Sequence, residues 1–174
     1  MAYPPNNMAW LYETQGRYGE AEPLYQVALA ISEKALGPDH PEVATILNGM
    51  ARLYQSQGRY DEAESLYLQA MALREKVLGS GHPEMAVDLN DIALLYHEQG
   101  RLREAEPLYL RALEIRQQSS QPLEAANVEL NLQTLYHSSG RQIDKEHIRE
   151  LTRILEKAGD RRAHAGRNLL AKLK

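Results

Sequence analysis

The stretch "NGMARLYQSQGRYDEAESLYLQAMAL" at residues 48–73 decides the fold, because near copies of it recur along the chain. The first copy, "NNMAWLYETQGRYGEAEPLYQVALAI", occupies residues 6–31, and the third, "NDIALLYHEQGRLREAEPLYLRALEI", occupies residues 90–115. Successive copies therefore begin 42 residues apart. A fixed internal period of this length indicates repeats that stack and share a core, because one repeat cannot bury its apolar face alone.

Each copy is predicted to form two helices joined by a tight turn. Ala51 and Tyr54 before the turn, and Ala63 and Tyr67 after it, lie at helical spacing, and the alanines allow close helix packing. Gly58 between them is typical of a helix C-terminus, where glycine adopts the left-handed conformation at little cost. The sequence therefore predicts an all-α solenoid of antiparallel helix pairs, without strands.

A fourth copy, "LNLQTLYHSSGRQIDKEHIRELTRIL" at residues 130–155, begins only 40 residues after the third. It keeps Tyr136 and Gly140 but has Lys145 and Arg149 where earlier copies have alanine and tyrosine. We interpret this copy as a degenerate terminal repeat, because the last repeat of a solenoid needs a polar outer face.

The linkers between the first three copies contain a histidine in a fixed context. One linker reads "LGPDHPEVA" at residues 36–44, and the other reads "LGSGHPEMA" 42 residues later. A metal site is one interpretation, but neither His40 nor His82 has a second histidine at ligand spacing. The other interpretation is that the linker marks the start of a helix. Proline would then lie in the first turn, and Asp39 and Glu42 have the spacing of a capping box. We favour the helix start.

Composition excludes several kinds of chemistry. The 174 residues hold no cysteine, which excludes disulfides, thiolate metal sites and cysteine nucleophiles. The net charge is −4, and residues 1–160 hold 15 basic against 24 acidic residues, which argues against a nucleic-acid partner. No apolar run is long enough to cross a membrane, and the N-terminus lacks the pattern of a secretory signal, so we expect a cytoplasmic protein.

The repeat resembles the tetratricopeptide repeat, in the 42-residue form of kinesin light chains and their bacterial relatives. The resemblance rests on Leu-x-x-Tyr, Gly, Tyr, Ala, Tyr and Ala at these intervals, and on the strings "LGPDHPEVA" and "QGRYDEAESLY". It covers about residues 4–158 and is strongest in the first three copies. It implies a right-handed superhelix of stacked helix pairs that binds other proteins and carries out no catalysis.

The resemblance also implies a division of the chain into a repeat domain, residues 1–158, and a basic C-terminal helix or tail, residues 159–174. The repeats within the first part are expected at about 5–46, 47–88, 89–128 and 129–158. Residues 161–174 hold five basic residues and no acidic one, and leucines at helical spacing suggest a short final helix there. A frayed tail is the alternative.

In this family the first helix of each pair lines a concave groove that holds an extended peptide. Carried over position by position, the inner face of this chain would show Asn6, Trp10, Glu13, Asn48, Arg52, Gln55, Asn90, Leu94, His97, Leu130, Thr134 and His137. The edge of the groove would show Tyr3, Thr45, Val87 and Asn127.

The recurring asparagines suggest how such a groove would work. Asn6, Asn48 and Asn90 occur once per repeat, and each amide offers a donor and an acceptor to the backbone of a bound peptide. Specificity would then come from Trp10 as an apolar anchor, and from Arg52 with the two groove histidines for an acidic side chain. We therefore expect a non-enzymatic scaffold with a protein or peptide ligand.

Other functions compete with this one. Catalysis is disfavoured because no serine lies in a recognisable motif, and because His97 and His137 lie on neighbouring helices too far apart to share a metal. We expect no cofactor. The main alternative is architectural, a module that assembles with itself or with a larger protein. Met8 and Leu11 lie on a first helix with no predicted cover, which suggests a homodimer through the N-terminal end.

Overall fold

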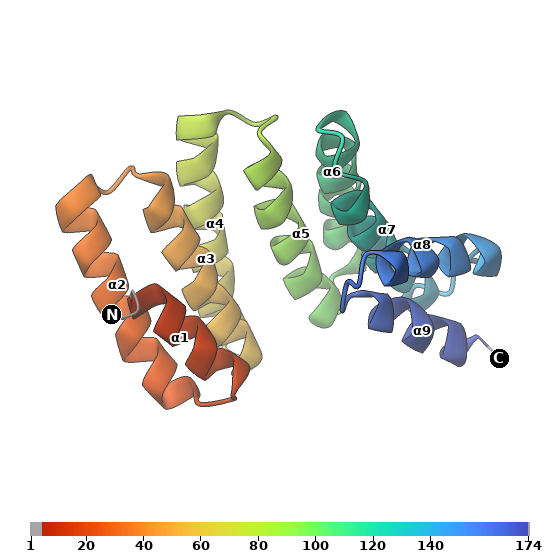
Figure 1. The fold of residues 1–174 in the computed structure, drawn as a ribbon, viewed down its shortest axis with the longest axis horizontal. Helices are drawn as coiled ribbons and strands as arrows, with labels where there is room; N and C mark the ends of the chain where they lie inside the picture. Colours follow the sequence, from red (N-terminus) through yellow and green to blue (C-terminus); the bar gives the residue numbers. More distant parts are fainter. Residues whose placement is uncertain (1–4, 174) are drawn as a thin grey trace. The chain divides into compact units, whose positions relative to one another are not determined.

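A computed structural model describes residues 5–173, so that the predicted groove-edge residue Tyr3 lies outside the described residues. Within this range the chain forms nine helices and no strand (Figure 1). The helices are α1 (Pro5–Thr14), α2 (Tyr18–Leu36), α3 (Pro41–Ser56), α4 (Tyr60–Leu78), α5 (Pro83–Glu98), α6 (Leu102–Gln118), α7 (Pro122–Ser138), α8 (Lys145–Lys157) and α9 (Ala163–Lys172). None of these helices combines the length and the apolar character needed to cross a bilayer.

The chain divides into two compact units, Met1–Leu95 and Tyr96–Lys174, and the boundary falls inside α5. In the first unit α1 packs on α2, α2 on α3, and α3 on α4. In the second unit α6 packs on α7, α7 on α8, and α8 on α9. The division at residue 158 that the repeat pattern suggested is a separate matter and stays a prediction.

The turn inside each helix pair has the predicted glycine stop. Gly58 has a φ of +74°, and its N–H donates to the Gln55 carbonyl oxygen at 2.9 Å. The next N–H, of Arg59, reaches back to the Tyr54 carbonyl oxygen at 2.9 Å, which completes a Schellman motif. The same left-handed conformation ends the first helix of the other pairs, at Gly16, Gly100 and Gly140. The predicted helix–turn–helix unit is therefore confirmed.

The arginine that follows each of these glycines ties the repeat together. The Arg59 guanidinium lies 3.8 Å from the centre of the Tyr54 ring, which is the geometry of a cation–π contact. Arg59 also pairs with Glu62 at 2.5 Å and with Glu22 of the preceding helix pair at 3.2 Å. The same stacking occurs for Arg17 on Tyr12, Arg101 on Tyr96 and Arg141 on Tyr136.

The histidine linkers start helices, as predicted, but the capping group is the histidine imidazole and not the Asp39 carboxylate. His40 is the N-cap of α3, and its Nδ1 accepts a hydrogen bond from the Glu42 N–H at 3.1 Å. His82 Nδ1 accepts from the Glu84 N–H at 3.2 Å in the same way. The expectation that Asp39 caps α3 was wrong, because the residue directly before the proline is the cap and its imidazole already satisfies the free N–H.

Tyrosines and alanines fill the interface inside each helix pair. Tyr25, Tyr67 and Tyr109 occupy one repeat position, and each is at most 1% exposed. The alanines that allow the two helices of a pair to pack closely are fully buried. They are Ala21, Ala63 and Ala105. This pattern explains how a chain without phenylalanine builds an aromatic core.

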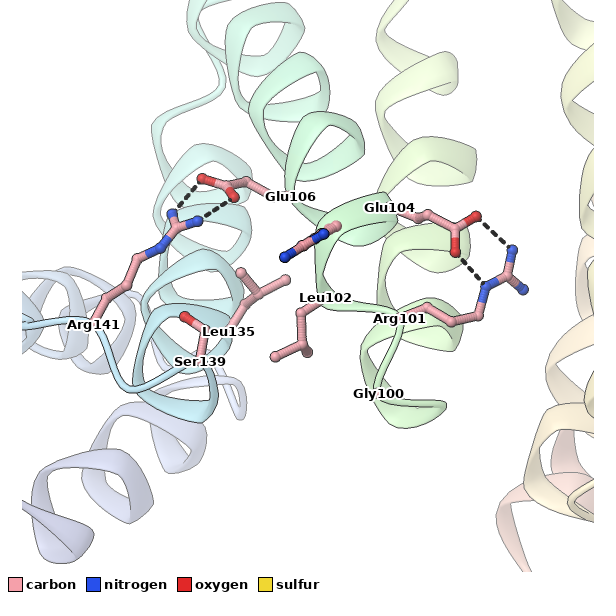
Figure 2. Close-up of a pocket in the computed structure, with 9 residues that line it drawn as sticks. Gly100, Arg101, Leu102, Glu104, Glu106, Leu135, Ser139 and Arg141 are labelled. Carbon is pink, nitrogen blue, oxygen red and sulfur yellow. Dashed lines mark hydrogen bonds and ion pairs between the residues drawn. The ribbon is translucent and has the colours of Figure 1, made fainter.

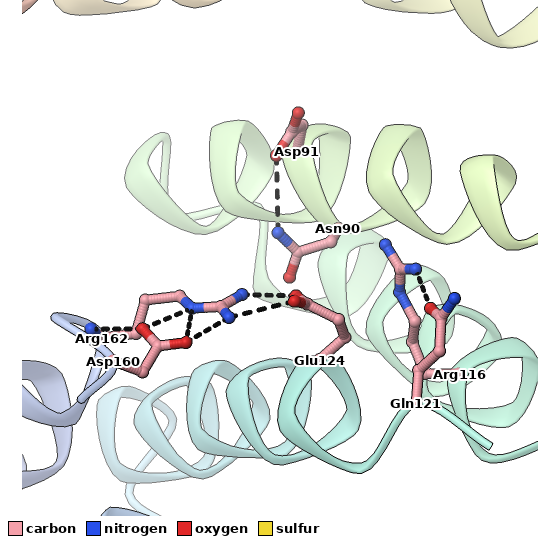
Figure 3. A network of polar contacts seen from close by, with 7 residues as sticks. All are labelled: Asn90, Asp91, Arg116, Gln121, Glu124, Asp160 and Arg162. Carbon is pink, nitrogen blue, oxygen red and sulfur yellow. Dashed lines mark hydrogen bonds and ion pairs between the residues drawn. The ribbon is translucent and has the colours of Figure 1, made fainter. Parts of the chain in front are cut away.

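The C-terminal residues form a packed helix. Leu169 of α9 is 3% exposed and belongs to a core cluster with Ile148 and Leu155 of α8. Arg162, just before α9, pairs with Asp160 and, at 2.5 Å, with Glu124 of α7 (Figure 3). Apolar packing and this ion-pair network together hold α9 against the rest of its unit.

Candidate functional site

The first unit contains a pocket of about 310 Å³ at the predicted inner face. Six residues that the sequence placed on that face or at its edge line it together: Asn6, Trp10, Thr45, Asn48, Arg52 and Val87. The other lining residues, which sequence reasoning did not propose, are Asn7, Tyr25, Gly49, Arg74 and Glu84.

Helical spacing brings the lining side chains together. Thr45, Asn48 and Arg52 follow one another at three and four residues on α3, and therefore share one face of that helix. Asn6 and Trp10 do the same on α1. Trp10 is 48% exposed, which is unusual for the largest apolar side chain of a chain with a single tryptophan.

Glu13 lies beneath this pocket as a buried partner of other side chains. It is 9% exposed and accepts a hydrogen bond from the Tyr25 hydroxyl at 2.7 Å. Arg52 donates to both of its oxygens, from Nε at 2.7 Å and from Nη2 at 3.1 Å. Burial alone would lower the pKa of Arg52, but the hydrogen bonds that Arg52 donates to Glu13 raise it overall. Two donors of Arg52 are therefore occupied, which argues against the predicted role of Arg52 as the contact for an acidic side chain.

Asn48 is 6% exposed and is tied to a second buried ion pair. Its Nδ2 donates to Asp88 Oδ1 at 3.0 Å, and Asp88 in turn forms an ion pair with Arg74. Arg74 Nη2 also donates to Thr45 Oγ1 at 3.1 Å. Burial raises the pKa of Asp88 to about 6, and Arg74 opposes that effect.

The remaining predicted groove residues of the first unit lie outside the pocket lining. Asn90 is half-buried and donates to Asp91 Oδ1 at 3.4 Å (Figure 3). Gln55 accepts a hydrogen bond from the Tyr67 hydroxyl at 2.9 Å, the role that Glu13 has in the first repeat. Leu94 is half-buried. The structure thus brings together two of the three recurring asparagines.

Of the groove residues predicted in the second unit, Leu130 is instead fully buried in the core, and Thr134 and His97 make local hydrogen bonds. His97 Nε2 lies 3.1 Å from Ser138 Oγ, but Ser138 donates its own hydrogen to the Thr134 carbonyl oxygen at 2.9 Å. Burial lowers the pKa of His97. His137 is half-buried, and no group of metal-binding side chains exists among the described residues. The Ser138 hydroxyl therefore does not donate its hydrogen to His97, as a serine activated by a histidine base must.

A larger pocket in the second unit, about 550 Å³, lies between the start of α6 and the end of α7. Four of its five charged lining residues form two pairs, which Figure 2 shows, and Arg103 is the fifth. Arg141 holds Glu106 by two hydrogen bonds of 2.6 and 2.8 Å, and Arg101 holds Glu104 by bonds of 2.9 and 2.8 Å. No predicted groove residue lines this pocket, and its pairs belong to the stacking of the repeats.

One residue of the site could have been found from the repeat. Asp88 occupies the position that Ile46 has in the preceding copy and Val128 in the following one, and all three are buried. A single acid at an otherwise apolar core position indicates a buried partner of opposite charge. Glu84 has no comparable signal in the repeat, because an acid at a helix start has an ordinary explanation.

Comparisons with known proteins agree with the helical repeat fold. The family model described as tetratricopeptide repeat matches residues 1–76 and 42–118. BtubC (BKLC) from P. vanneervenii is 26% identical with a TM-score of 0.76, over 89% of this chain and 63% of that one. The kinesin light chain with nearly identical TPR-like repeats from Podosopora anserina is 25% identical with a TM-score of 0.75, over 99% and 87% of the two chains.

A third solved structure shows likeness of fold only. Aspartyl phosphate phosphatase F from Bacillus subtilis is 19% identical with a TM-score of 0.76, over 90% of this chain and 40% of that one. This chain therefore spans less than two thirds of the length of BtubC and of the phosphatase. With the helices and turns described above, these matches confirm the predicted all-α fold class and show that the chain belongs to the tetratricopeptide repeat family, in its kinesin light chain-like form.

Proposed function

We propose that this chain is a non-enzymatic scaffold that holds an extended segment of another protein against the first helices of its repeats. The tetratricopeptide repeat fold generally mediates protein–protein interaction, and its family is typically non-enzymatic. The observation that carries the proposal is the half-exposed Trp10, which lines one pocket with Asn6 and Asn48. Exposed tryptophans in a pocket with amides are typical anchors of protein interfaces.

The proposal is tested by selecting peptides against the purified chain. A display library of random twelve-residue peptides is selected on the wild type, and the affinity of each selected peptide is measured for Trp10→Ala. We expect binding about tenfold weaker or more, because buried aromatic anchors contribute most of the free energy of such interfaces. Ile31→Ala is the matched control, because Ile31 is an exposed apolar residue of the same unit, 52% exposed and outside the pocket.

Asn6→Ala is the second test of the pocket, and we expect a smaller loss because one neutral hydrogen bond contributes about 1 kcal/mol. Asn48→Ala is less informative, because it also removes the hydrogen bond that Asn48 donates to the buried Asp88. Selected peptides that bind Trp10→Ala and Asn6→Ala as well as wild type would contradict the proposal.

A specific observation also favours the architectural alternative. Leu11, Val27, Ile31 and Leu36 of α1 and α2 are each about half exposed, at 47–52%. Apolar side chains that gather on one helix pair suit contact with a second copy of the chain. Light scattering at rising concentration tests this function. A dimer that Ile31→Glu dissociates and Trp10→Ala does not would support it, and a monomer at millimolar concentration would exclude it.

A further inference from the structure

We propose that the pocket of the first unit receives a basic side chain, lysine or arginine, of the bound segment. This inference rests on the proposed function and specifies its ligand. It departs from the sequence-based expectation of an acidic partner. Four features of the unit carry it: the pairing of its arginines, the unpaired carboxylate of Glu84, the free oxygen of a buried amide, and the exposed tryptophan.

The arginines of the pocket are already matched by acids. Arg52 is held by both oxygens of Glu13, and Arg74 by Asp88. A ligand carboxylate would have to compete with these pairs, which sit in a partly desolvated site where charge pairs are strong. The pocket therefore offers little to an acidic side chain.

A carboxylate remains without a counter-charge after these pairs are counted. Glu84 lines the pocket and is exposed, and its side chain makes no ion pair within residues 5–173. Val87 and Asp91 follow on the same face of α5, three and seven residues later. Asp91 is half-buried and accepts a hydrogen bond from the Asn90 amide, and the charges of Arg52 and Arg74 also act on it. Glu84 is therefore the acidic residue that α5 contributes to the pocket lining, and it is the one without an ion pair.

The amide of Asn48 supplies an independent feature that points to a hydrogen-bond donor. Its Nδ2 is directed at carboxylates, with Asp88 Oδ1 at 3.0 Å, and this fixes the orientation of the amide. Its Oδ1 accepts no hydrogen bond within residues 5–173 and is not among the fully buried side-chain atoms that lack a partner, so solvent reaches it. Because Asn48 is only 6% exposed and lines the pocket, this oxygen is an acceptor that a ligand N–H can satisfy.

Trp10 provides the apolar surface that a basic side chain prefers. Indole is the strongest of the aromatic rings for cation–π contact, and the aliphatic stem of lysine or arginine can pack on the same ring. The 48% exposure of Trp10 leaves such a surface available inside the pocket. The occupant that matches an exposed indole, a free amide oxygen and an unpaired carboxylate carries both an alkyl stem and a positive charge.

The electrostatics of the buried pair agree with this assignment. Burial is the main cause of the raised pKa of Asp88, but the charges of Asp91 and Glu84 raise it further. The pKa of Asp91 is also raised, chiefly by burial. The charges of Asp91 and Glu84 therefore disfavour the ionised form of Asp88, and a cation beside Glu84 would reduce that effect.

The experiment uses Trp10 as its own reporter, because it is the only tryptophan of the chain. The full chain is titrated with N-acetyl-lysine methylamide and N-acetyl-arginine methylamide, with N-acetyl-norleucine methylamide and N-acetyl-glutamate methylamide as uncharged and acidic comparisons. We expect a saturable change of Trp10 fluorescence for the two basic probes, with affinities at least fivefold above norleucine and with glutamate weakest. Equal affinities for all four probes, or no saturation with the basic probes, would overturn the inference.

Two matched variants test the role of the carboxylate. Glu84→Gln should weaken the basic probes about fivefold and leave norleucine unchanged. Glu42→Gln should change neither, because Glu42 has the same place in the first turn of α3 and lies outside the pocket. Thermal melts of both variants establish that each is folded, so unchanged affinity in a folded Glu84→Gln chain counts against the inference.

The peptide selection separates this inference from the proposed function. Peptides enriched in lysine or arginine that depend on Trp10 and on Glu84 support both. Peptides that depend on Trp10 but show no basic enrichment overturn the basic side chain and leave the scaffold function in place. Peptides that do not depend on Trp10 overturn the site as a whole.

Discussion

Arg74 and Arg116 lie 42 residues apart on α4 and α6 and are both buried, at 4% and 8% exposure, yet their surroundings differ. Arg74 pairs with Asp88 and donates to Thr45. Arg116 contacts the side-chain oxygen of Gln121, makes no ion pair within residues 5–173, and has a buried Nε without an acceptor (Figure 3). The same repeat position thus holds an arginine with a direct ion pair in one unit and an arginine without one in the other.

The difference comes from the partner position and not from the arginine. Asp88 on α5 corresponds to Val128 on α7 in the repeat pattern, so the third repeat keeps the cation and lacks the acid. A buried pair costs desolvation energy that the mutual attraction roughly offsets, whereas an unpaired buried charge has no such compensation. The repeat therefore sets where a side chain lies, while its energetic effect depends on neighbours that the repeat does not fix.

The largest expected effect comes from removing each arginine in turn. Arg74→Met leaves Asp88 buried without its counter-charge, and we expect the free energy of unfolding to fall by about 3–5 kcal/mol. Arg116→Met removes a charge that makes no direct ion pair, and we expect a change within about 1 kcal/mol of wild type. Urea denaturation of both variants measures the difference. Equal losses would show that the comparison of the two arginines is wrong.

The reverse experiment supplies the missing acid. Val128→Asp places a carboxylate where Arg116 can meet it, while Ile46→Asp places one at the equivalent position of the first repeat pair, where residue 32 is serine. Both sites are buried, and an unpaired charge there costs several kcal/mol. We expect Val128→Asp to be less destabilising than Ile46→Asp by about 1–2 kcal/mol. Equal destabilisation in urea unfolding would mean that Arg116 does not reach the new carboxylate.

Much of the fold was predictable because the repeat encodes local physics. A glycine every 42 residues, with alanines and tyrosines at helical spacing, was enough to predict the helix pairs and the turns that the structure shows. The His40 cap was missed because histidine is an uncommon N-cap and Asp39 beside it offered the usual spacing. The boundary between units inside α5 has no counterpart in the repeat pattern.

The site was predictable only as far as backbone position. The positions transferred from the family resemblance placed Asn6, Trp10 and Asn48 on one face, and these residues do line one pocket. It could not show that Arg52 is held by Glu13, because that contact joins residues 39 apart through rotamers that spacing does not fix. The choice between an acidic and a basic ligand depends on such pairings, so it required the structure.

The floor of the first-unit pocket allows a sharper test of packing. A Cβ built on Gly49 would lie 2.7 Å from Cε1 of the Tyr25 ring, which is fully buried and cannot move aside easily. We expect Gly49→Ala to destabilise the chain by about 1–3 kcal/mol, as overpacked cores do. Gly19→Ala is the control, because nothing lies within 4 Å of its Cβ position on α2, and we expect it to be neutral or slightly stabilising. A Gly49→Ala chain as stable as wild type would indicate that the Tyr25 side chain can adopt another rotamer without loss of stability.

The smallest expected effects are pH shifts, and the two units should show opposite signs. Burial raises the pKa of Asp88 to about 6 against the opposing charge of Arg74, with Asp91 and Glu84 adding to the rise. Arg162 lowers the pKa of Asp160 to about 2 through its hydrogen bonds.

Because the pKa of Asp88 is higher in the folded chain than in the unfolded chain, the folded chain binds a proton on Asp88 more tightly. The stabilisation that this proton gives is therefore complete below about pH 4, and it is lost as pH rises through about 6. The pKa of Asp160 is lower in the folded chain than in the unfolded chain. The stabilisation that the ionised Asp160 gives is therefore complete above about pH 4 and is lost as pH falls through about 2. Relative to Asp88→Asn, the wild type should therefore become more stable from pH 7 to pH 4. Relative to Asp160→Asn, its advantage should shrink from pH 5 to pH 3. Urea unfolding of the three chains across this range measures both trends, and two trends of the same sign would mean that Arg74 controls Asp88 as fully as Arg162 controls Asp160.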